Sequence, residues 1–381
     1  MKPEQYIRGF DGLRAIAVGL VLAAHSNTWE PWRGHGWFDQ FVFPLVLGLN
    51  GVLLFFVLSG FLITLLLLRE RRASGYVRVG YFLLRRALRL LPAFVLFFSV
   101  LLVLTLGGWY DIHPYSFAFA GLYLYNFIPK HFYSGYFGLT WSLGVEEQFY
   151  LLWPWLLGRR AERNDALPRV GGLAVGGIVL SLLFMAVVPD LLLPDLAVTE
   201  GGETIDLGAY TVGRVFFPYR WFIPMASYLL LGCVAAAWVD GRNQVPANVR
   251  WWPWAALLLL VFPWYNPGLG HFPQKLLQAT GATLLLLWIY YRPAGWLTRL
   301  LELPPLRHLG RLSYGLYLYS GIFLATGIDE PEYWWQELPA ALVLTYLLAL
   351  FSHFTLERWF LGLKQRFTPP RSTPTPKPDV V

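Results

Sequence analysis

The feature that most constrains the fold of this chain is a series of long apolar stretches that recurs along most of its 381 residues. Only 14% of the residues are charged and 56% are hydrophobic, which leaves no soluble segment large enough to fold separately. Because a transmembrane helix needs about 20 apolar residues, we predict an all-α, polytopic integral membrane protein with about ten transmembrane helices. The predicted spans lie near residues 10–28, 45–68, 88–107, 138–157, 170–189, 218–239, 251–266, 273–291, 312–328 and 338–358.

Basic residues are distributed very unevenly between the two sets of loops. With the N-terminus in the cytoplasm, the inner loops hold 17 Lys or Arg against 5 Asp or Glu, and the outer loops hold 3 against 12. Cytoplasmic loops of membrane proteins carry an excess of Lys and Arg. We therefore expect both termini in the cytoplasm and a multi-pass position in the cytoplasmic (inner) membrane, surrounded by lipid. The formal net charge of +7 reflects this loop bias, so no nucleic-acid partner is expected.

Two segments depart from the regular pattern. Residues 115–128 are apolar but short, and counting them as a crossing would move the arginines of 158–169 to the outer side. We expect them to form a re-entrant or outer-surface piece. Residues 366–381 are rich in Pro and Thr and are expected to form a disordered cytoplasmic tail after a membrane domain at 1–365. The single cysteine, Cys233, supports neither a disulfide nor a cysteine-bound metal.

The first apolar stretch, FDGLRAIAVGLVLAAHS, carries titratable residues at both ends. Asp11 and Arg14 lie at its start and His25 lies at its end. The eleven-residue separation of Arg14 from His25 places both on one helix face, about 16 Å apart. Charged groups inside a span are costly and usually functional. We therefore expect this face to line a polar path, with Asp11 pairing to Arg14.

Two further motifs each allow two interpretations. YFLLRRALRLLPAF places Arg85, Arg86 and Arg89 at the inner mouth of the third predicted span. They form either an anion site, because guanidinium forks match phosphate geometry, or a set of arginines that anchor the topology by snorkelling. In the second span, Ser59 and Gly60 mark either a functional position or close helix packing through a small residue.

The stretch WSLGVEEQFYLLWP carries adjacent acids, Glu146 and Glu147, within the outer half of a predicted span. A carboxylate at this depth more often partners a cation or faces a cavity than lies at the interface. His25 is expected at a similar depth, so Glu146 and His25 could meet. Adjacent helical residues point about 100° apart, so only one of the two acids can face His25.

Tyrosines are concentrated in residues 310–321 and in one outer segment. GRLSYGLYLYSG contains Ser313, Tyr314 and Tyr317, which belong either to the site or to an aromatic belt at the membrane interface. The outer segment 109–136 is also rich in Trp and Tyr. Its rings form either a sugar-stacking surface or ordinary interface aromatics.

Taken in order, these stretches resemble the acyltransferase family 3 membrane proteins, which transfer acyl groups to sugars and other extracytoplasmic acceptors. The resemblance covers about residues 6–360 and rests on FDGLRAIAV followed by His25, then FFVLSGFLIT, RRALRLLP, WSLGVEEQFYLLWP and LSYGLYLY. It implies that His25 is the essential histidine, Arg14 its motif partner and Glu146 the acid of the fourth motif. The coenzyme A phosphate contacts that it implies are Arg85, Arg86 and Arg89.

The resemblance implies a membrane O-acyltransferase. Its donor would be cytoplasmic acyl-CoA, with acetyl-CoA expected, and its acceptor a hydroxyl of a cell-envelope glycan or lipid-linked sugar; no metal is expected. His25 would act either as a general base on the acceptor hydroxyl or as a nucleophile that carries the acyl group. Glu146 would orient the ring of His25 and stabilise its imidazolium.

The sequence departs from the family pattern at two positions, and two other functions stay open. Ser320 stands where many members have histidine, and Trp359 stands where they often have proline. No SGNH-type periplasmic domain is expected, so we expect either that the membrane domain completes the transfer alone or that a separate periplasmic partner accepts the acyl group. The alternatives are acylation of a small secondary metabolite and a transporter or flippase for a polyisoprenyl-linked glycan, which would also have midplane charges.

Overall fold

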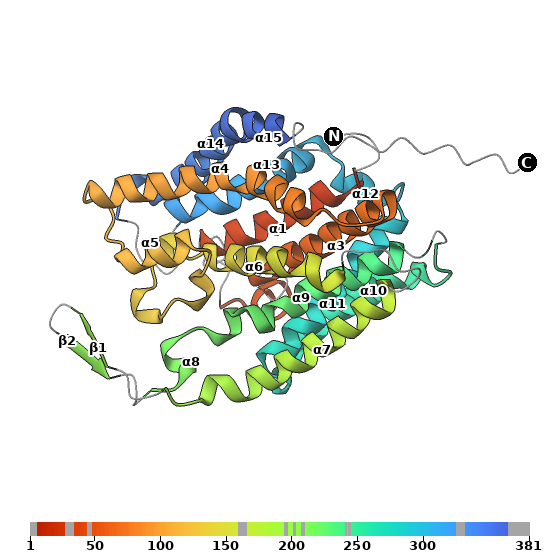
Figure 1. Ribbon diagram of the computed structural model, residues 1–381, viewed down its shortest axis with the longest axis horizontal. Helices are drawn as coiled ribbons and strands as arrows, with labels where there is room; N and C mark the ends of the chain where they lie inside the picture. Colours follow the sequence, from red (N-terminus) through yellow and green to blue (C-terminus); the bar gives the residue numbers. More distant parts are fainter. Residues whose placement is uncertain are drawn as a thin grey trace, which may run out of the picture.

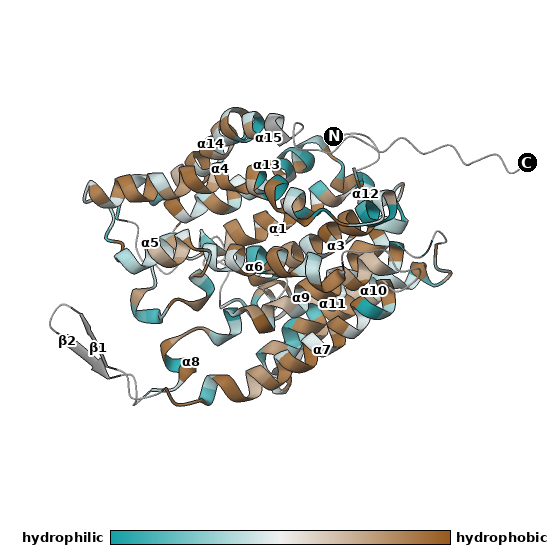
Figure 2. Ribbon diagram, viewed as in Figure 1, coloured by the Kyte–Doolittle hydropathy of each residue, from teal (hydrophilic) through white to brown (hydrophobic). Residues whose placement is uncertain are grey.

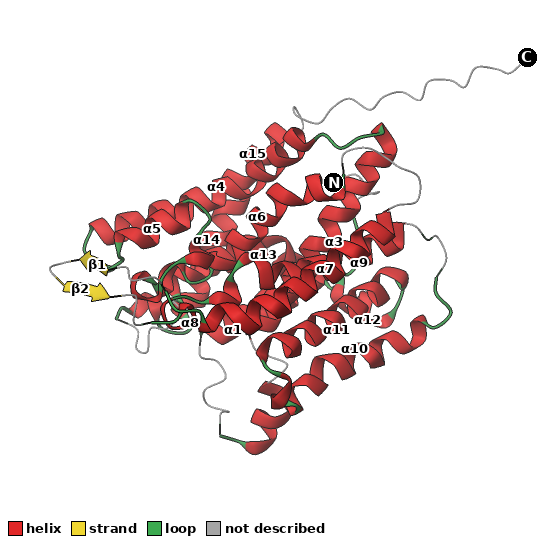
Figure 3. Cartoon of the chain, turned by 60° about the horizontal axis from the view of Figure 1, so that its bottom comes forward, coloured by secondary structure: helices red, strands yellow, loops and turns green. Residues whose placement is uncertain are grey.

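The chain forms a bundle of helices whose axes run in nearly the same or opposite directions (Figure 1). One small antiparallel hairpin, made of β1 (Ala197–Glu200) and β2 (Glu203–Asp206), lies at an edge of the bundle (Figure 3). The computed structural model describes residues 6–26, 34–43, 48–158, 166–193, 197–200, 203–206, 210–240, 242, 245–324 and 332–364. The predicted disordered tail at 366–381 lies outside these residues.

A helix overlaps each of the predicted apolar stretches, although several helices begin or end outside them. These helices are α1 (Phe10–His25), α3 (Gly48–Ser74), α4 (Val79–Leu106), α6 (Thr140–Leu157), α7 (Ala166–Val187), α9 (Phe222–Asp240), α10 (Trp252–Val261), α11 (His271–Tyr291), α13 (Pro304–Phe323) and α14 (Ala340–Ser352). Shorter elements are α5 (Pro114–Gly121), α8 (Val212–Val215), α12 (Trp296–Leu301), α15 (Arg358–Lys364) and the π-helices η3 (Phe38–Val42) and η13 (His353–Glu357). The 3₁₀ turns are η4 (Tyr125–Phe127), η5 (Lys130–Phe132), η6 (Gly135–Phe137), η7 (Val188–Asp190), η8 (Pro218–Arg220), η9 (Val249–Trp251), η10 (Phe262–Tyr265), η11 (Pro267–Leu269) and η12 (Trp334–Gln336).

Among the described residues, five helical segments are both long and apolar enough to cross a membrane. They are Gly48–Ser74, Val79–Leu106, Ala166–Asp190, Pro218–Asp240 and Ala340–Gly362. The apolar character of the bundle is visible as brown along most helix bodies in Figure 2. These features are those of a multi-pass membrane protein.

The structure adds detail to the hydropathy prediction at the start of α4 and within residues 115–128. Helix α4 begins at Val79, nine residues before the predicted span, because arginine and leucine are good helix formers even where charge lowers the hydropathy. Within 115–128, α5 and the turn η4 replace a continuous helix. A helix of the length of α5 rises only about 12 Å, too little to span.

Helix connections and short elements distinguish two ends of the bundle. At one end, which we call the basic end, α3 is followed by α4, α6 by α7, α9 by α10 and α11 by α12. At the opposite end, which we call the hairpin end, lie α5, α8 and the hairpin (Figure 1). Helix α1 starts near the basic end, because its Gly12 packs against Leu301 of α12.

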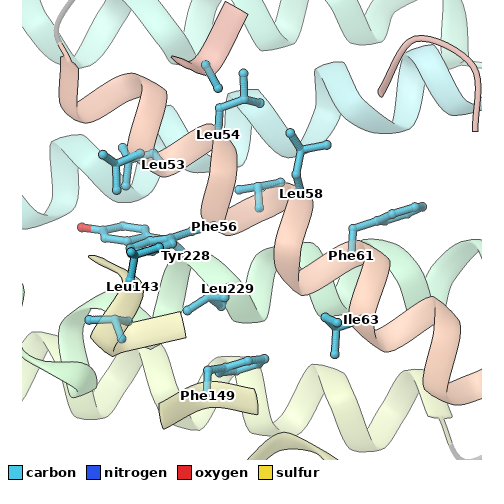
Figure 4. Close-up of a cluster of buried hydrophobic side chains, with 14 of the residues drawn as sticks. Leu53, Leu54, Phe56, Leu58, Phe61, Ile63, Leu143, Phe149, Tyr228 and Leu229 are labelled. Carbon is cyan, nitrogen blue, oxygen red and sulfur yellow. The ribbon is translucent and has the colours of Figure 1, made fainter. Parts of the chain in front are cut away.

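Helix α3 packs in the middle of the bundle and crosses α9 through glycines. A Cβ at Gly60 would collide with the backbone oxygen of Leu229, and one at Gly232 would collide with that of Val57. Lipid is as apolar as leucine, so helices in membranes associate through such close packing. Figure 4 shows apolar side chains from α3, α6 and α9 that fill this core. The packing interpretation of the Ser59–Gly60 pair is therefore confirmed for Gly60.

Candidate active site

Glu146 on α6 is the centre of a polar cluster that joins three helices. Ser59 on α3 donates its hydroxyl to Glu146 Oε1 at 2.8 Å, and Tyr150, one turn along α6, donates to Oε2 at 3.0 Å. Arg86 on α4 places Nη2 4.0 Å from Oε2. The Glu146 and Arg86 side chains are only 13% and 16% exposed, so this charge pair is largely shielded from solvent. A buried carboxylate needs such partners.

The guanidinium of Arg86 is held by a ring but keeps an unused donor. Its Cζ lies 3.9 Å from the centre of the Tyr150 ring, a cation–π contact. Its Nε is buried and has no hydrogen-bond partner among the described residues. An unsatisfied buried donor costs about 1–3 kcal/mol. An anionic ligand is the kind of group that would satisfy it.

Arg14 extends this cluster onto α1. Its Nη1 donates to Asp11 Oδ1 at 3.2 Å, which is the pair that the sequence predicts. Arg14 also interacts electrostatically with Arg86 and Tyr150. We use the name central cluster for the residues that these hydrogen bonds, ion pairs and electrostatic interactions connect. Its members are Asp11, Arg14, Ser59, Arg86, Arg89, Glu146, Glu147 and Tyr150.

The three arginines near the start of α4 have different surroundings. Arg85 Nη2 lies 3.0 Å from Glu70 Oε2 on α3, so a carboxylate already occupies its fork. Arg89 is exposed and has no hydrogen bond or ion pair among the described residues, although Arg14 and Arg86 interact with it electrostatically. The structure therefore brings Arg86 and Arg89 into the central cluster and directs Arg85 to a different partner.

His25 forms the last residue of α1 and is partly buried. Its Nδ1 lies 2.7 Å from the backbone oxygen of Val21. A carbonyl oxygen only accepts hydrogen bonds, so Nδ1 carries the hydrogen in this contact. The lone pair of Nε2 is then available to take a proton or to act as a nucleophile.

Glu146 and His25 lie at different depths of the bundle. Gly48 packs against Ala24, which places His25 level with the start of α3. Ser59, the partner of Glu146, lies eleven residues further along α3, a rise of about 16 Å. The expected contact between Glu146 and His25 is therefore wrong for this structure. The reason is the register of α1, α3 and α6, which places the acid beside arginines instead.

The second acid and the tyrosine motif also face the interior. Glu147 interacts electrostatically with Arg86, so neither acid of the pair faces His25. Tyr314 donates its hydroxyl to Leu90 O at 3.1 Å, and Tyr317 shares a 2.6 Å hydrogen bond with Ser142. The side chains of Ser313 and Tyr317 are also buried. The aromatic-belt interpretation is therefore wrong for Tyr317.

Segment 115–128 is held against α6 by contacts that were not predicted from the sequence. Gln148 Nε2 donates to Tyr123 O and to Asn126 Oδ1, both at 3.0 Å. Tyr123 has a φ of 56°, which is uncommon outside glycine and often marks a constrained position. The segment thus folds back beside the two acids. The one signal in the sequence was the position of Gln148 directly after them.

A second missed group is Glu357, which ends the π-helix η13. Ser352 donates to Glu357 Oε1 at 3.2 Å and itself accepts a 2.6 Å hydrogen bond from Tyr319. Glu357 also interacts electrostatically with Arg89. Short π-helical segments frequently occur at functional sites. In the described part of the chain, no group of three or more His, Cys, Asp or Glu could hold a metal ion.

The membrane-length helices and the buried charge cluster together define an integral membrane protein with an internal polar site. The sequence matches the acyltransferase domain of the acyltransferase 3 family over residues 7–358, so the chain belongs to this family of acyltransferases. Membership in an enzyme family favours catalysis over the transporter alternative.

Two relatives indicate the kind of reaction found among similar proteins. The chain is 29% identical to "Putative peptidoglycan O-acetyltransferase YrhL" of Bacillus subtilis, over 93% of this chain and 55% of that protein. It is 26% identical to "Peptidoglycan O-acetyltransferase OatA" of Listeria monocytogenes, over 93% of this chain and 56% of that protein. The chain therefore spans about half the length of these relatives. No solved structure matches it.

Proposed function

We propose that this protein is an O-acetyltransferase of the cytoplasmic membrane. It takes an acetyl group from acetyl-CoA on the cytoplasmic side and transfers it to a hydroxyl of a cell-envelope glycan, or of its lipid-linked precursor, on the outer side. The observation that carries this proposal is the separation of the central cluster from His25 within one acyltransferase domain. The names of the two relatives favour a glycan acceptor over a small metabolite.

The proposed topology has ten spans, with the basic end in the cytoplasm. In this topology, the ten helices that overlap the predicted apolar stretches alternate in direction between the two ends of the bundle. The excess of Lys and Arg in the loops at the basic end supports its cytoplasmic position. Both termini and the donor side are then cytoplasmic, and the hairpin end, with His25, faces outward.

At the donor end, Arg86 and Arg89 bind the phosphates of coenzyme A. This role is supported by the unpartnered Nε of Arg86 and by the guanidinium of Arg89, which has no ion pair among the described residues. Arg14, held by Asp11, supplies a further positive charge. Glu146 acts here as a positioning residue, because its carboxylate holds Arg86 through their ion pair.

At the acceptor end, His25 acts on the acceptor hydroxyl or on the thioester. As a general base, Nε2 takes the hydroxyl proton while the oxygen attacks the thioester carbonyl and coenzyme A leaves as the thiolate. As a nucleophile, Nε2 first attacks the thioester carbonyl and forms an acyl-imidazolium while coenzyme A leaves as the thiolate. The acceptor hydroxyl then attacks the acyl carbon, the imidazole leaves, and its Nε2 takes the hydroxyl proton. The long pantetheine arm of coenzyme A suits a site whose arginines and histidine are about 16 Å apart.

The proposal is tested with purified protein in lipid nanodiscs. Radiolabelled acetyl-CoA is supplied with the peptidoglycan disaccharide N-acetylglucosaminyl-N-acetylmuramic acid, and O-acetylated product is measured by mass spectrometry. We expect product with the wild type and none with His25→Ala. The matched control is His131→Ala, because His131 is an exposed histidine of the same hairpin end. Absence of product with the wild type, or normal product with His25→Ala, would contradict the proposal.

A further inference from the structure

The guanidinium of Arg220 is surrounded by aromatic rings at the hairpin end. Its Cζ lies 4.3 Å from the ring centre of Phe217, 5.4 Å from that of Tyr219, and 5.5 Å from those of Tyr133 and Trp141. These rings come from three separate parts of the chain: the segment before α6, α6 itself and the turn before α9. The fold therefore assembles a cage around this one cation.

The cage holds Arg220 without cancelling its charge. Cation–π contacts orient a guanidinium through the ring quadrupole and leave its formal charge intact. Within the described ranges, no carboxylate and no hydrogen-bond acceptor contacts this guanidinium. Arg220 differs in this respect from Arg14, Arg85 and Arg86, each of which has a carboxylate within 4.0 Å. The N–H donors of Arg220 are thus available to a ligand.

The cage lies at the same end of the bundle as His25, the residue proposed to perform the transfer. Arg220 interacts electrostatically with His25. It also interacts with Tyr317, whose hydroxyl binds Ser142 on α6. A group bound by Arg220 would therefore be close to the imidazole of His25, at the end of the bundle opposite the donor arginines.

We propose that Arg220 binds an anionic group of the acceptor, a carboxylate or a phosphate, and so presents a neighbouring hydroxyl to His25. This inference rests on the proposed function and adds the charge of the acceptor to it. The guanidinium fork offers two parallel donors to such an anion, which fixes orientation as well as adding affinity. The bound anion would also offset the repulsion between Arg220 and a His25 that has taken a proton.

Direct binding tests this inference independently of catalysis. The probe is N-acetylglucosaminyl-N-acetylmuramic acid, compared with its neutral methyl ester, and binding to the full-length protein in nanodiscs is measured by calorimetry. Hydrogen bonds to charged groups contribute about 1.5–3 kcal/mol, so the wild type should prefer the acid by about 10- to 100-fold. Arg220→Gln should lose this preference while it binds the ester as the wild type does.

A matched control separates a local effect from a general change of charge. Arg214→Gln makes the same substitution at the same end of the bundle, where the Arg214 guanidinium lies 4.6 Å from the ring centre of Tyr210 and is exposed. It should keep the preference for the acid. Arg220→Lys, which retains the charge without the fork, should keep only part of it.

A second pair of probes distinguishes the two sources of the anion. Both probes are the methyl ester of the disaccharide. One carries a prenyl diphosphate at its reducing end, and the other carries a neutral prenyl ether there. If Arg220→Gln loses affinity for the free acid alone, the anion that Arg220 binds is the carboxylate. If it loses affinity for the diphosphate alone, the anion is the diphosphate of the lipid carrier. The proposal is overturned if the wild type binds charged and neutral probes equally, or if Arg220→Gln weakens both equally. Acetyl transfer is not required for either result, so this failure is distinct from failure of the proposed function.

Discussion

Replacing Glu146 by glutamine removes a carboxylate from the central cluster while it preserves the shape of the side chain. The change leaves Arg86 without the acid at 4.0 Å. Ser59 and Tyr150 each donate to a different oxygen of the carboxylate, and the single amide oxygen of glutamine can accept only one of these two hydrogen bonds, as a neutral one. Removing one partner of a buried ion pair costs about 3–5 kcal/mol. The pair is slightly exposed and the amide oxygen still accepts a hydrogen bond, so we expect a loss of about 2–3 kcal/mol.

The matched control is Glu147→Gln, which removes the same charge one residue away. Glu147 interacts with Arg86 only electrostatically and has no hydrogen bond among the described residues. Its substitution should cost less than that of Glu146, because it removes no hydrogen bond and no ion pair within 4.0 Å. Both variants are compared with the wild type by thermal unfolding in detergent, followed by intrinsic tryptophan fluorescence.

A double-mutant cycle with Arg86→Gln measures the interaction energy between Arg86 and Glu146. The loss of stability in Arg86→Gln/Glu146→Gln should be smaller than the sum of the two single losses, because the second substitution removes a charge already left without its partner. Additive losses, or equal losses for Glu146→Gln and Glu147→Gln, would refute the assignment of Glu146 as the acid that holds Arg86.

Three further predictions concern other parts of the structure. Ser59→Ala removes a 2.8 Å hydrogen bond to a carboxylate and should lower stability by about 1.5–3 kcal/mol, measured by the same unfolding assay. Gly60→Ala forces a methyl group into a backbone oxygen and should reduce the yield of folded protein in size-exclusion chromatography, whereas Gly172→Ala, with nothing within 4 Å, should not. Cysteine at exposed Tyr76 should be labelled only from the cytoplasmic side, and cysteine at exposed Leu192 only from the outer side.

Each of these predictions has an outcome that would contradict it. Ser59→Ala with wild-type stability would mean that its hydroxyl does not support the cluster. Equal yields for Gly60→Ala and Gly172→Ala would argue against the tight crossing of α3 and α9. The labelling is done with Cys233→Ala, since Cys233 is the only native cysteine and is buried. Labelling of both introduced cysteines from one side would exclude the ten-span topology.

The sequence was sufficient to predict where the helices lie. Apolar length and charge bias are local properties, and each predicted stretch overlaps a helix. The Asp11–Arg14 pair was also predictable, because both residues lie on one helix with fixed geometry. By the same reasoning, segment 115–128 was expected not to cross, and it contains only a short helix and a 3₁₀ turn.

The contacts between helices could not be predicted in this way. The depth of Glu146 relative to His25 depends on the positions of α6 and α1 along α3. The separation of about 16 Å between the two residues cannot be read from the residue spacing within either helix. The cage of Arg220 likewise takes its rings from positions as far apart as Tyr133 and Phe217. Such juxtapositions arise from packing, which a single sequence does not encode in any local pattern.

The measurement that tests the central claim most directly is the affinity for coenzyme A, determined by calorimetry on the wild type and three variants. If the arginines of the central cluster hold the donor and His25 acts at the opposite end, Arg89→Gln should weaken binding about tenfold or more. Arg85→Gln, on the same helix but paired with Glu70, should bind nearly as the wild type does, and so should His25→Ala. Unchanged affinity in Arg89→Gln, or an equal loss in His25→Ala, would contradict a donor site separated from the transfer residue.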